Sequence, residues 1–216
     1  GYQAAILLLR AGAEVICITR FPVDAASRYS KEEDFNDWGH RLRIHGVDLR
    51  HTPSVEALCE QIVREHARLD FIINNACQTV RRPPAFYAHM MAKELEMKSD
   101  QTGLSLVVSR RSEETHSSAS LSQVPLLDED HLDPAALFPA GRLDADLQQI
   151  DLREMNSWRL RMADVSTIEL LEVHLVNVIA PFIINARLKP LMVAVPTADK
   201  HIVNVSAMEG QFYRTY

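Results

Sequence analysis

The order of apolar and polar positions along the first third of the chain predicts helices that alternate with short strands. Apolar residues recur every three or four positions over residues 2–10 and again after Thr52, which indicates two amphipathic helices. Mostly apolar runs at 14–19, 44–47 and 69–73 are typical of strands buried in a parallel sheet. This α-β-α-β-α-β order predicts an α/β fold built on a doubly wound parallel sheet.

Serine and glutamate at capping-box spacing predict two further helix starts. Ser30 with Glu33 predicts a polar helix, and Ser166 with Glu169 predicts a later, more apolar one. Because proline lacks the backbone N–H of a regular helix, we expect the second helix to bend or break at Pro181.

Residues 98–157 interrupt the regular pattern. They are rich in Ser, Asp, Glu and Pro, and we predict disorder over 109–123 and short surface-packed helical turns over 124–152. A strand is predicted at 201–205, after the apolar helix. Since a crossover between parallel strands needs only a dozen residues or somewhat more, we interpret 98–157 as an acidic, partly disordered insertion within one domain spanning 1–216.

The charge balance argues against a nucleic-acid-binding protein. Lys and Arg number 23 and Asp and Glu number 29 among the 216 residues, a formal net charge of −6, whereas phosphate-backbone binders need a basic surface. No apolar run approaches the roughly 20 residues of a membrane-spanning helix, and the first residues lack a signal-peptide pattern. We therefore expect a cytoplasmic protein with neither a nucleic-acid nor a membrane partner.

The metal-ligating residue types show no metal-site spacing. Cys17, Cys59 and Cys77 lie far apart and form no C-x-x-C pair, which argues against a zinc site or a disulfide framework. The acidic residues of 128–133 lack the ligand spacing of a divalent-cation site, and we expect a solvated turn there. No metal is predicted.

Polar residues follow three of the predicted strands. Thr19 and Arg20 end the first strand, Asp48 follows the second, and Asn74 and Asn75 follow the third. Ligands of open parallel sheets bind outside the carboxyl ends of the strands, so this row predicts a nucleotide site. The alternatives are a role for Asp48 as a helix-preceding turn or cap residue, turn roles for the two asparagines and a solvated surface position for Arg20.

Several short motifs, taken in order, resemble the short-chain dehydrogenase/reductase family. They are Asp48-Leu49, Asn74-Asn75-Ala76, Asn177 and Ile202-Val203-Asn204-Val205-Ser206. The resemblance implies a Rossmann-like, three-layer α/β/α fold that binds NAD(P), with Asp48 and Leu49 at the adenine ring. It assigns Asn74, Asn75 and Ala76 to the cofactor ribose region and to support of the central strand.

The resemblance also bears on the two ends of the chain. Gly1 aligns with the last glycine of the family's phosphate-binding turn, directly before the first helix. We therefore expect a partial domain, an atypical member truncated at both ends, whose first strand and C-terminal part lie outside this sequence.

Thr19 and Arg20 bear on the choice of cofactor. An acidic residue after the second strand of such folds accepts the ribose 2′-OH of NAD, whereas a nearby arginine accommodates the 2′-phosphate of NADP. This chain has Thr19 followed by Arg20, and a planar guanidinium suits a phosphate. We predict NADP as the preferred cofactor, with NAD as the alternative.

The resemblance further implies a reaction centre of tyrosine, lysine, serine and asparagine. Asn177 matches the asparagine, which holds a proton-relay water in the family. Ala207 stands at the catalytic serine position, so the preceding Ser206 is the candidate, and the tyrosine is expected beyond Tyr216. Cys77 replaces the glycine that normally closes the Asn-Asn-Ala-Gly motif.

Together these observations predict an oxidoreductase that transfers hydride between NADP(H) and a small carbonyl or alcohol substrate. Ala207, Cys77 and the insertion motivate the competing hypothesis, a catalytically silent relative that binds nucleotide or a protein partner. Family members pair through the helix that carries Asn177, so the resemblance also implies a homo-oligomer.

Overall fold

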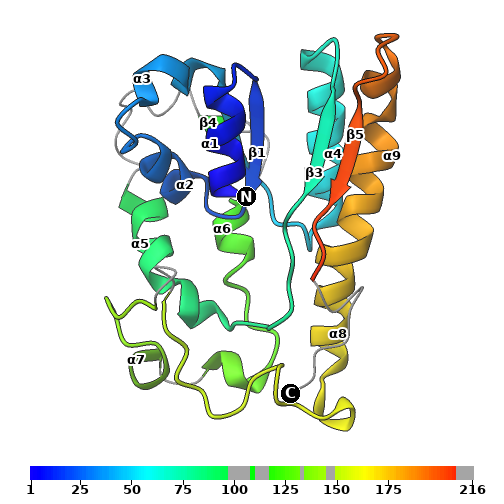
Figure 1. Cartoon of the computed structure of the whole chain (residues 1–216). Coiled ribbons are helices and arrows are strands. Elements are labelled where there is room, and N and C mark those ends of the chain that lie inside the picture. The colour runs from blue at the N-terminus through cyan, green and yellow to red at the C-terminus, as the bar shows by residue number, and fades with distance from the viewer. Residues whose placement is uncertain (97–107, 110–116, 132–133, 145–148, 208–216) are drawn as a thin grey trace.

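Helices and strands alternate over the first 74 residues of the computed structural model, as the apolar pattern predicts (Figure 1). The structure describes residues 1–96, 108–109, 117–131, 134–144 and 149–207. The strands are β1 Val15–Thr19, β2 Leu42–Gly46, β3 Phe71–Asn74, β4 Val108–Ser109 and β5 His201–Asn204. The longer helices are α1 Tyr2–Arg10, α2 Pro22–Tyr29, α4 Thr52–Glu65, α5 Ala88–Glu96, α8 Thr167–His174 and α9 Ala180–Val193. Short helices are α3 Phe35–Trp38, α6 Ser118–Leu121 and α7 Pro134–Leu137, with 3₁₀ turns η1 Gly39–Arg41, η2 Pro84–Tyr87, η4 Asp128–His131 and η5 Met162–Asp164.

Glycine and proline set several of the helix ends. Gly12 follows α1 with a φ of 96°, the left-handed region that favours glycine after a helix. Pro53 occupies the first turn of α4, where its missing N–H costs nothing. The capping-box prediction at Ser30 was wrong, because Pro22 starts α2 earlier and Ser30 ends it, donating its N–H to the Ala26 carbonyl at 3.0 Å.

The described strands pair in parallel and form two separate ladders. β1 pairs with β2, from Val15 opposite Leu42 onward, and β2 pairs with β4. β3 pairs with β5, from Phe71 opposite His201 to the last residues of both strands. Within the described part of the chain no ladder joins β1 to β3. The predicted parallel pairing is therefore present, but in two sheets instead of one.

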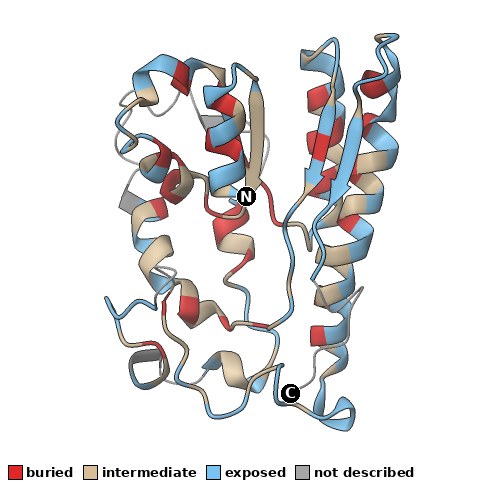
Figure 2. Cartoon of the chain, in the orientation of Figure 1, coloured by how far each residue is buried: buried red, intermediate tan, exposed pale blue. Residues whose placement is uncertain are grey.

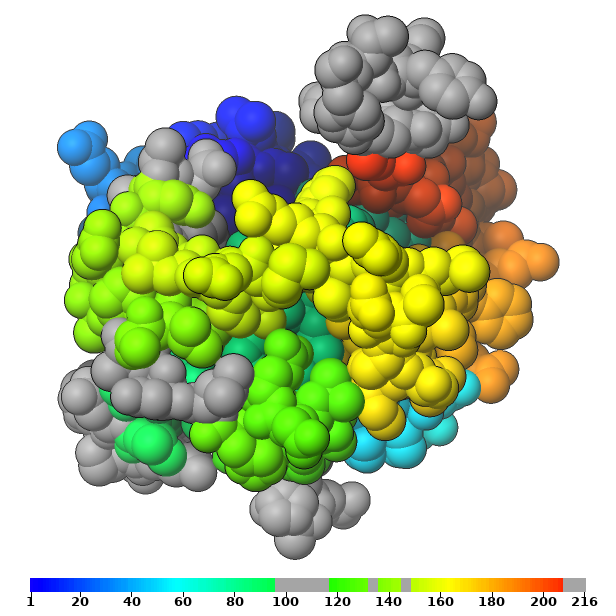
Figure 3. Space-filling model, turned by 90° about the horizontal axis from the view of Figure 1, so that it is seen from below, coloured from blue at the N-terminus to red at the C-terminus, as the bar shows by residue number. Residues whose placement is uncertain are grey.

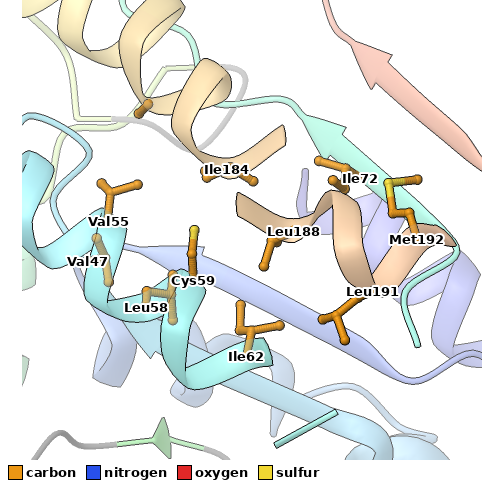
Figure 4. Close-up of a cluster of buried hydrophobic side chains, with 11 residues drawn as sticks. Val47, Val55, Leu58, Cys59, Ile62, Ile72, Ile184, Leu188, Leu191 and Met192 are labelled. Atoms are coloured by element: carbon orange, nitrogen blue, oxygen red, sulfur yellow. The ribbon is translucent and has the colours of Figure 1, made fainter. Parts of the chain in front are cut away.

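Helices cover both faces of β1, which gives this sheet the three layers of an α/β/α fold. Val15 and Cys17 pack against the apolar cluster formed with α1, α2 and α3. Ile16 and Ile18 pack against the second cluster, which lies between α4 and α9 and includes Ile72 of β3 (Figure 4). β1 is nevertheless only half-buried along its length, less than predicted, since it has a paired neighbour on one side only.

The β3–β5 ladder has helices on one face. Ile72 is buried against α4 and α9, whereas Phe71 and Ile73 on the other face are exposed. Ile202 and Val203 of β5 are also exposed, so both strands are pale blue over most of their length in Figure 2. The core of this half of the molecule therefore lies between the sheet and the two helices.

One continuous helix of 27 residues, Thr167–Val193, comprises α8, the π-helical turn η6 Leu175–Ile179 and α9. Ser166 caps it as predicted, its Oγ accepting the Glu169 N–H at 3.1 Å. The helix does not break at Pro181, which lies in the first turn of α9, and the π turn η6 precedes it.

This helix is long and apolar enough to cross a membrane, with 33% of its most apolar window buried. The expectation that no segment has the length and hydropathy of a membrane span was therefore wrong. The same length and composition occur in core helices, and α9 packs closely along α4 (Figure 1). The absence of a membrane partner stays a prediction.

The described parts of the insertion pack on the domain. Ser118 of α6 is buried and donates to the Arg20 carbonyl at 2.8 Å, and Phe138 packs edge-on against Phe86. The disorder predicted over 109–123 was wrong for 117–123, which contain α6, and residues 110–116 lie outside the described residues. The short turns predicted further on are present as η4 and α7. Seen from below, these green-to-yellow segments occupy much of the middle of the face (Figure 3).

Candidate functional site

A cavity of about 460 Å³ opens at the carboxyl ends of β1 and β2. It gathers five of the residues predicted to bind the cofactor, namely Thr19, Arg20, Asp48, Leu49 and Ala76. The loop after β3 lines the cavity with Cys77, Gln78, Thr79, Val80 and Arg82. Tyr87 of η2, Trp158 just after the insertion and Val176 of η6 complete this part of the lining. The volume suits a small organic ligand, and the location is the one that open parallel sheets use for ligands.

Arg20 is a cation held at the cavity by aromatic rings. Its Nη2 donates to the Tyr87 hydroxyl at 2.9 Å, and its guanidinium carbon lies 4.5 Å from the centre of the Tyr87 ring. It forms no ion pair with any residue that the structure describes. Arg20 is half-buried and has no carboxylate partner among the described residues, so its guanidinium suits an anionic ligand.

Asp48 is held by the turn that follows β2. Its side chain is buried and accepts the Arg50 N–H at 2.9 Å and an Arg50 Nη2 bond at 2.7 Å. Burial opposes ionisation, but the hydrogen bonds from Arg50 outweigh it and lower the pKa of Asp48. Asp48 thus acts as a turn residue before α4, which is the alternative that the sequence left open. Its contact with adenine stays a prediction.

Asn74 ties β3 to its neighbours. Its Nδ2 donates to Asn204 Oδ1 at 2.8 Å and to Asn185 Oδ1 at 3.2 Å, joining β3 to β5 and α9. Asn75 is exposed beside the start of α1, where a Cβ added to Gly1 would lie 3.1 Å from Asn75 Nδ2. Gly1, Asn74 and Asn75 lie outside the lining of the cavity, so the structure separates them from the other five predicted residues.

Asn177 lies in the π turn η6 and binds the loop after β3. Its Oδ1 accepts the Gln78 N–H at 2.8 Å, and its Nδ2 donates to the Gln78 carbonyl at 2.9 Å. Gln78 and the neighbouring Val176 both line the cavity. π turns often mark functional sites because they are irregularities that a helix retains at a cost. The predicted proton-relay role of Asn177 is untested by these contacts.

The other predicted reaction-centre residues are not gathered at the cavity. Ser206 and Ala207 follow β5 and are exposed, and neither lines the cavity. Residues 208–216, with both late tyrosines, lie outside the described residues. Cys77 is exposed and does line the cavity, next to Ala76.

Sequence reasoning missed a buried ion-pair network that adjoins the cavity. Its centre is Glu172 of α8, whose Oε1 binds Arg50 at 2.5 Å and whose Oε2 binds Arg81 at 3.1 Å. Arg81 also binds Asp130 at 2.6 Å and Glu129 at 2.9 Å. The solvated turn expected over 128–133 was wrong at Asp130, whose side chain is fully buried, and Arg81 is itself only 3% exposed.

Arg153 extends this network within the insertion. It binds Asp151 at 2.7 Å and Glu129 at 3.3 Å, and it donates to the Arg81 carbonyl at 3.0 Å. Ser157 accepts the Arg81 N–H at 2.9 Å and donates to the Glu169 carboxylate. These bonds join the loop after β3 to the insertion and to α8. In the parts of the chain that the structure describes, no group of three or more His, Cys, Asp or Glu residues is placed to hold a metal ion.

Comparisons with known proteins agree with an α/β fold of the Rossmann type. Residues 1–114 match the short chain dehydrogenase family. An uncharacterized protein of Acanthamoeba polyphaga mimivirus is 31% identical over 224 residues, which cover 98% of this chain and 42% of that relative. The family consists of oxidoreductases that generally bind NAD(P), and the matched segment contains every strand-end residue of the cavity. The chain belongs to the short chain dehydrogenase family.

Proposed function

We propose that the protein is an oxidoreductase that transfers hydride between NADP(H) and a small carbonyl or alcohol compound. The observation that carries the proposal is the cavity at the strand ends, which joins Arg20, Asp48 and Ala76 in a single site. Family membership supports the reaction class, and Arg20 supports NADP over NAD.

The residues present suit the adenosine end of such a dinucleotide. Thr19 places a hydroxyl, not a carboxylate, at the end of β1, and that hydroxyl accepts the Phe21 N–H at 3.2 Å. A 2′-phosphate therefore meets the Arg20 guanidinium without a neighbouring acid at position 19 to repel it. The Thr19 hydroxyl and the Arg20 guanidinium thus favour binding of the adenosine end of the cofactor at the end of β1.

When bound, the nicotinamide ring would supply or accept the hydride. The residues of this chain would bind and orient the cofactor: Arg20 through its guanidinium, and the loop after β3 through its contact with the cavity. Asn177 would act by fixing that loop, because both of its hydrogen bonds hold the Gln78 backbone.

The second candidate is a relative that binds the nucleotide without turning it over. It is favoured by Ala207 at the expected serine position and by the exposed location of Ser206 outside the cavity. Without a hydroxyl against the reacting carbonyl, the oxyanion-type stabilisation of the family would be missing. Nucleotide sensing or protein interaction would then be the function.

Fluorescence titration with NADPH and NADH tests the proposal first. We expect NADPH to bind more tightly, and Arg20→Gln to remove that preference. A panel of aldehydes and ketones then tests turnover by NADPH oxidation, with Asn177→Ala expected to reduce it. Binding without turnover on any carbonyl compound would favour the second candidate. Binding of neither nucleotide would contradict both.

We also propose a cytoplasmic homo-oligomer without a nucleic-acid partner. The continuous helix leaves apolar side chains exposed, among them Leu170, Leu171, Val178 and Phe182. Such a stripe is typical of a helix that packs against another subunit. Light scattering of the purified protein tests the oligomeric state, since a monomeric mass would contradict a homo-oligomer.

A further inference from the structure

We infer that Arg82 is a second ligand for the 2′-phosphate and acts together with Arg20 to select NADP over NAD. The inference rests on the proposed function and adds to it a residue from the loop after β3. Arg20 and Arg82 both line the cavity, although 61 other residues separate them along the chain.

The two arginines rest on neighbouring aromatic rings of η2. The Arg82 guanidinium carbon lies 4.2 Å from the centre of the Phe86 ring, and that of Arg20 lies 4.5 Å from the centre of the Tyr87 ring. The two rings are themselves in contact, with centroids 5.1 Å apart. Stacking on a ring restrains a guanidinium while leaving its N–H edge available for a ligand.

None of the acidic residues that the structure describes forms an ion pair with these two arginines. Arg82, like Arg20, forms no ion pair with any residue in the described part of the chain. The carboxylates that feel their charge are Asp48 for Arg20 and Asp151 for Arg82. Each of those is already bound at 2.7 Å by a different arginine, Arg50 or Arg153. Two cations with unfilled donors therefore border one cavity.

The adjacent Arg81 shows by contrast what a structural arginine looks like here. Arg81 is 3% exposed, does not line the cavity and binds Glu129, Asp130 and Glu172. Arg82 has none of these partners, so the network does not account for it. A phosphate monoester carries a charge of about −1.5 to −2 at neutral pH, and a pair of guanidinium groups matches that charge better than one.

The insertion gives this arrangement a support. Phe86 is 2% exposed and packs edge-on against Phe138 of the insertion, with centroids 5.6 Å apart. The buried Pro83 lies between Arg82 and η2 and restricts the backbone there. The Phe86 ring on which Arg82 stacks is thus held in place by the insertion.

Binding measurements on the full chain test the inference without relying on turnover. We would titrate wild type, Arg82→Gln and Arg82→Lys with NADPH and NADH, and repeat the titrations with 2′,5′-ADP and 5′-AMP as fragments. Arg64→Gln is the matched control, because Arg64 is exposed on α4, away from the cavity. Far-UV circular dichroism checks that each variant is folded.

We expect Arg82→Gln to weaken NADPH and 2′,5′-ADP about 10-fold to 100-fold, the range of a lost charge-assisted hydrogen bond. NADH and 5′-AMP should be unaffected, Arg82→Lys should be intermediate, and Arg64→Gln should behave as wild type. Equal losses for all four ligands, or no loss for any, would overturn the inference. A wild type that binds NADH as well as NADPH would overturn it while leaving hydride transfer open, and one that binds neither would overturn the proposed function too.

Discussion

Asn177 grips the backbone of Gln78 with both ends of its side-chain amide, at 2.8 and 2.9 Å, across a sequence separation of 99 residues. The pair joins the π turn η6 to the loop after β3, whose next residues form one wall of the cavity. An amide is suited to this role because it offers one donor and one acceptor at a fixed spacing. Asn177 therefore positions cavity residues in addition to any part in the reaction.

Replacing Asn177 with alanine should lower the stability of the protein, because the loop after β3 loses its attachment to η6. Two hydrogen bonds are lost and the Gln78 N–H and carbonyl are left without their partner, at a cost of about 1–3 kcal/mol in the free energy of unfolding. Asn177→Asp should cost a similar amount, since a carboxylate cannot donate to the Gln78 carbonyl. Urea denaturation measures both variants, and Asn36→Ala, at an exposed asparagine on α3, is the control. Equal stability of all four proteins would contradict the positioning role.

Glu172 should matter more for stability than a surface glutamate does. It binds both Arg50 and Arg81, and its side chain is only 5% exposed. Glu172→Gln removes one carboxylate from Arg50, which keeps Asp48, and one from Arg81, which keeps Asp130. The loss of these two charge-assisted hydrogen bonds should cost about 1–3 kcal/mol. The matched control is Glu56→Gln, which breaks the exposed Glu56–Arg187 pair and should change the stability much less, because water screens exposed charges. Chemical denaturation of both variants in one buffer checks the difference, and similar losses would contradict it.

The sequence predicts those features of the fold that depend on local patterns. The helical period of α1 and α4 and the apolar runs of β1 to β3 each lie within a short window, so their element types and order were confirmed to within a few residues. Polar residues at strand ends likewise located the cavity, because parallel strands bring their carboxyl ends to one edge. Ser30 was misread because a capping box and the end of a preceding helix both place serine beside polar residues.

Contacts between distant segments were beyond the sequence. Arg81 and Asp130 are 49 positions apart, and an acidic run beside a basic loop is equally consistent with two solvated surfaces. Their pairing depends on how the insertion packs, which no periodicity encodes. The same holds for Arg82, whose importance is visible only where Phe86 and the cavity flank it.

Acid should destabilise the protein through the carboxylates of the network. Burial opposes the ionisation of Asp130, but hydrogen bonds from Arg81 and from two backbone N–H groups outweigh it, so its pKa is lowered. The pKa values of Asp48 and Asp151 are lowered in the same way by Arg50 and Arg153. As the pH decreases through the unfolded-state pKa of about 3.9, these carboxylates take up protons in the unfolded chain before they do so in the folded chain. The free energy of unfolding therefore decreases as the pH decreases.

We therefore expect little change in the free energy of unfolding from these groups between pH 7 and pH 5, and a progressive loss below about pH 4. Asp130→Asn should be less stable than wild type at pH 7, and the difference should narrow as the pH falls. Denaturant titrations from pH 7 to pH 3 measure this, with Asp37→Asn, at an exposed aspartate on α3, as the control. A difference that stays constant across this range would show that the charge of Asp130 is not what stabilises the fold.

The three cysteines should differ sharply in reactivity. Cys77 is exposed and lines the cavity, whereas burial raises the pKa of the Cys59 thiol to about 11 and also raises that of the half-buried Cys17. Because the thiolate is the nucleophile, an alkylating reagent at pH 8 should modify Cys77 first and Cys59 last. Peptide mass mapping over time identifies the order, and Cys77→Ser should remove the fast phase.

The same measurement reports on the cavity if NADPH is added before the reagent. A nucleotide lying along the strand ends would cover Cys77 and slow its alkylation, while Cys17 and Cys59, which do not line the cavity, should react as before. If NADPH slows the alkylation of Cys77 and slows it less in Arg20→Gln, NADPH binds in this cavity and Arg20 contributes to its binding. If saturating NADPH leaves the Cys77 rate unchanged, the nucleotide binds elsewhere and the assignment of this cavity falls.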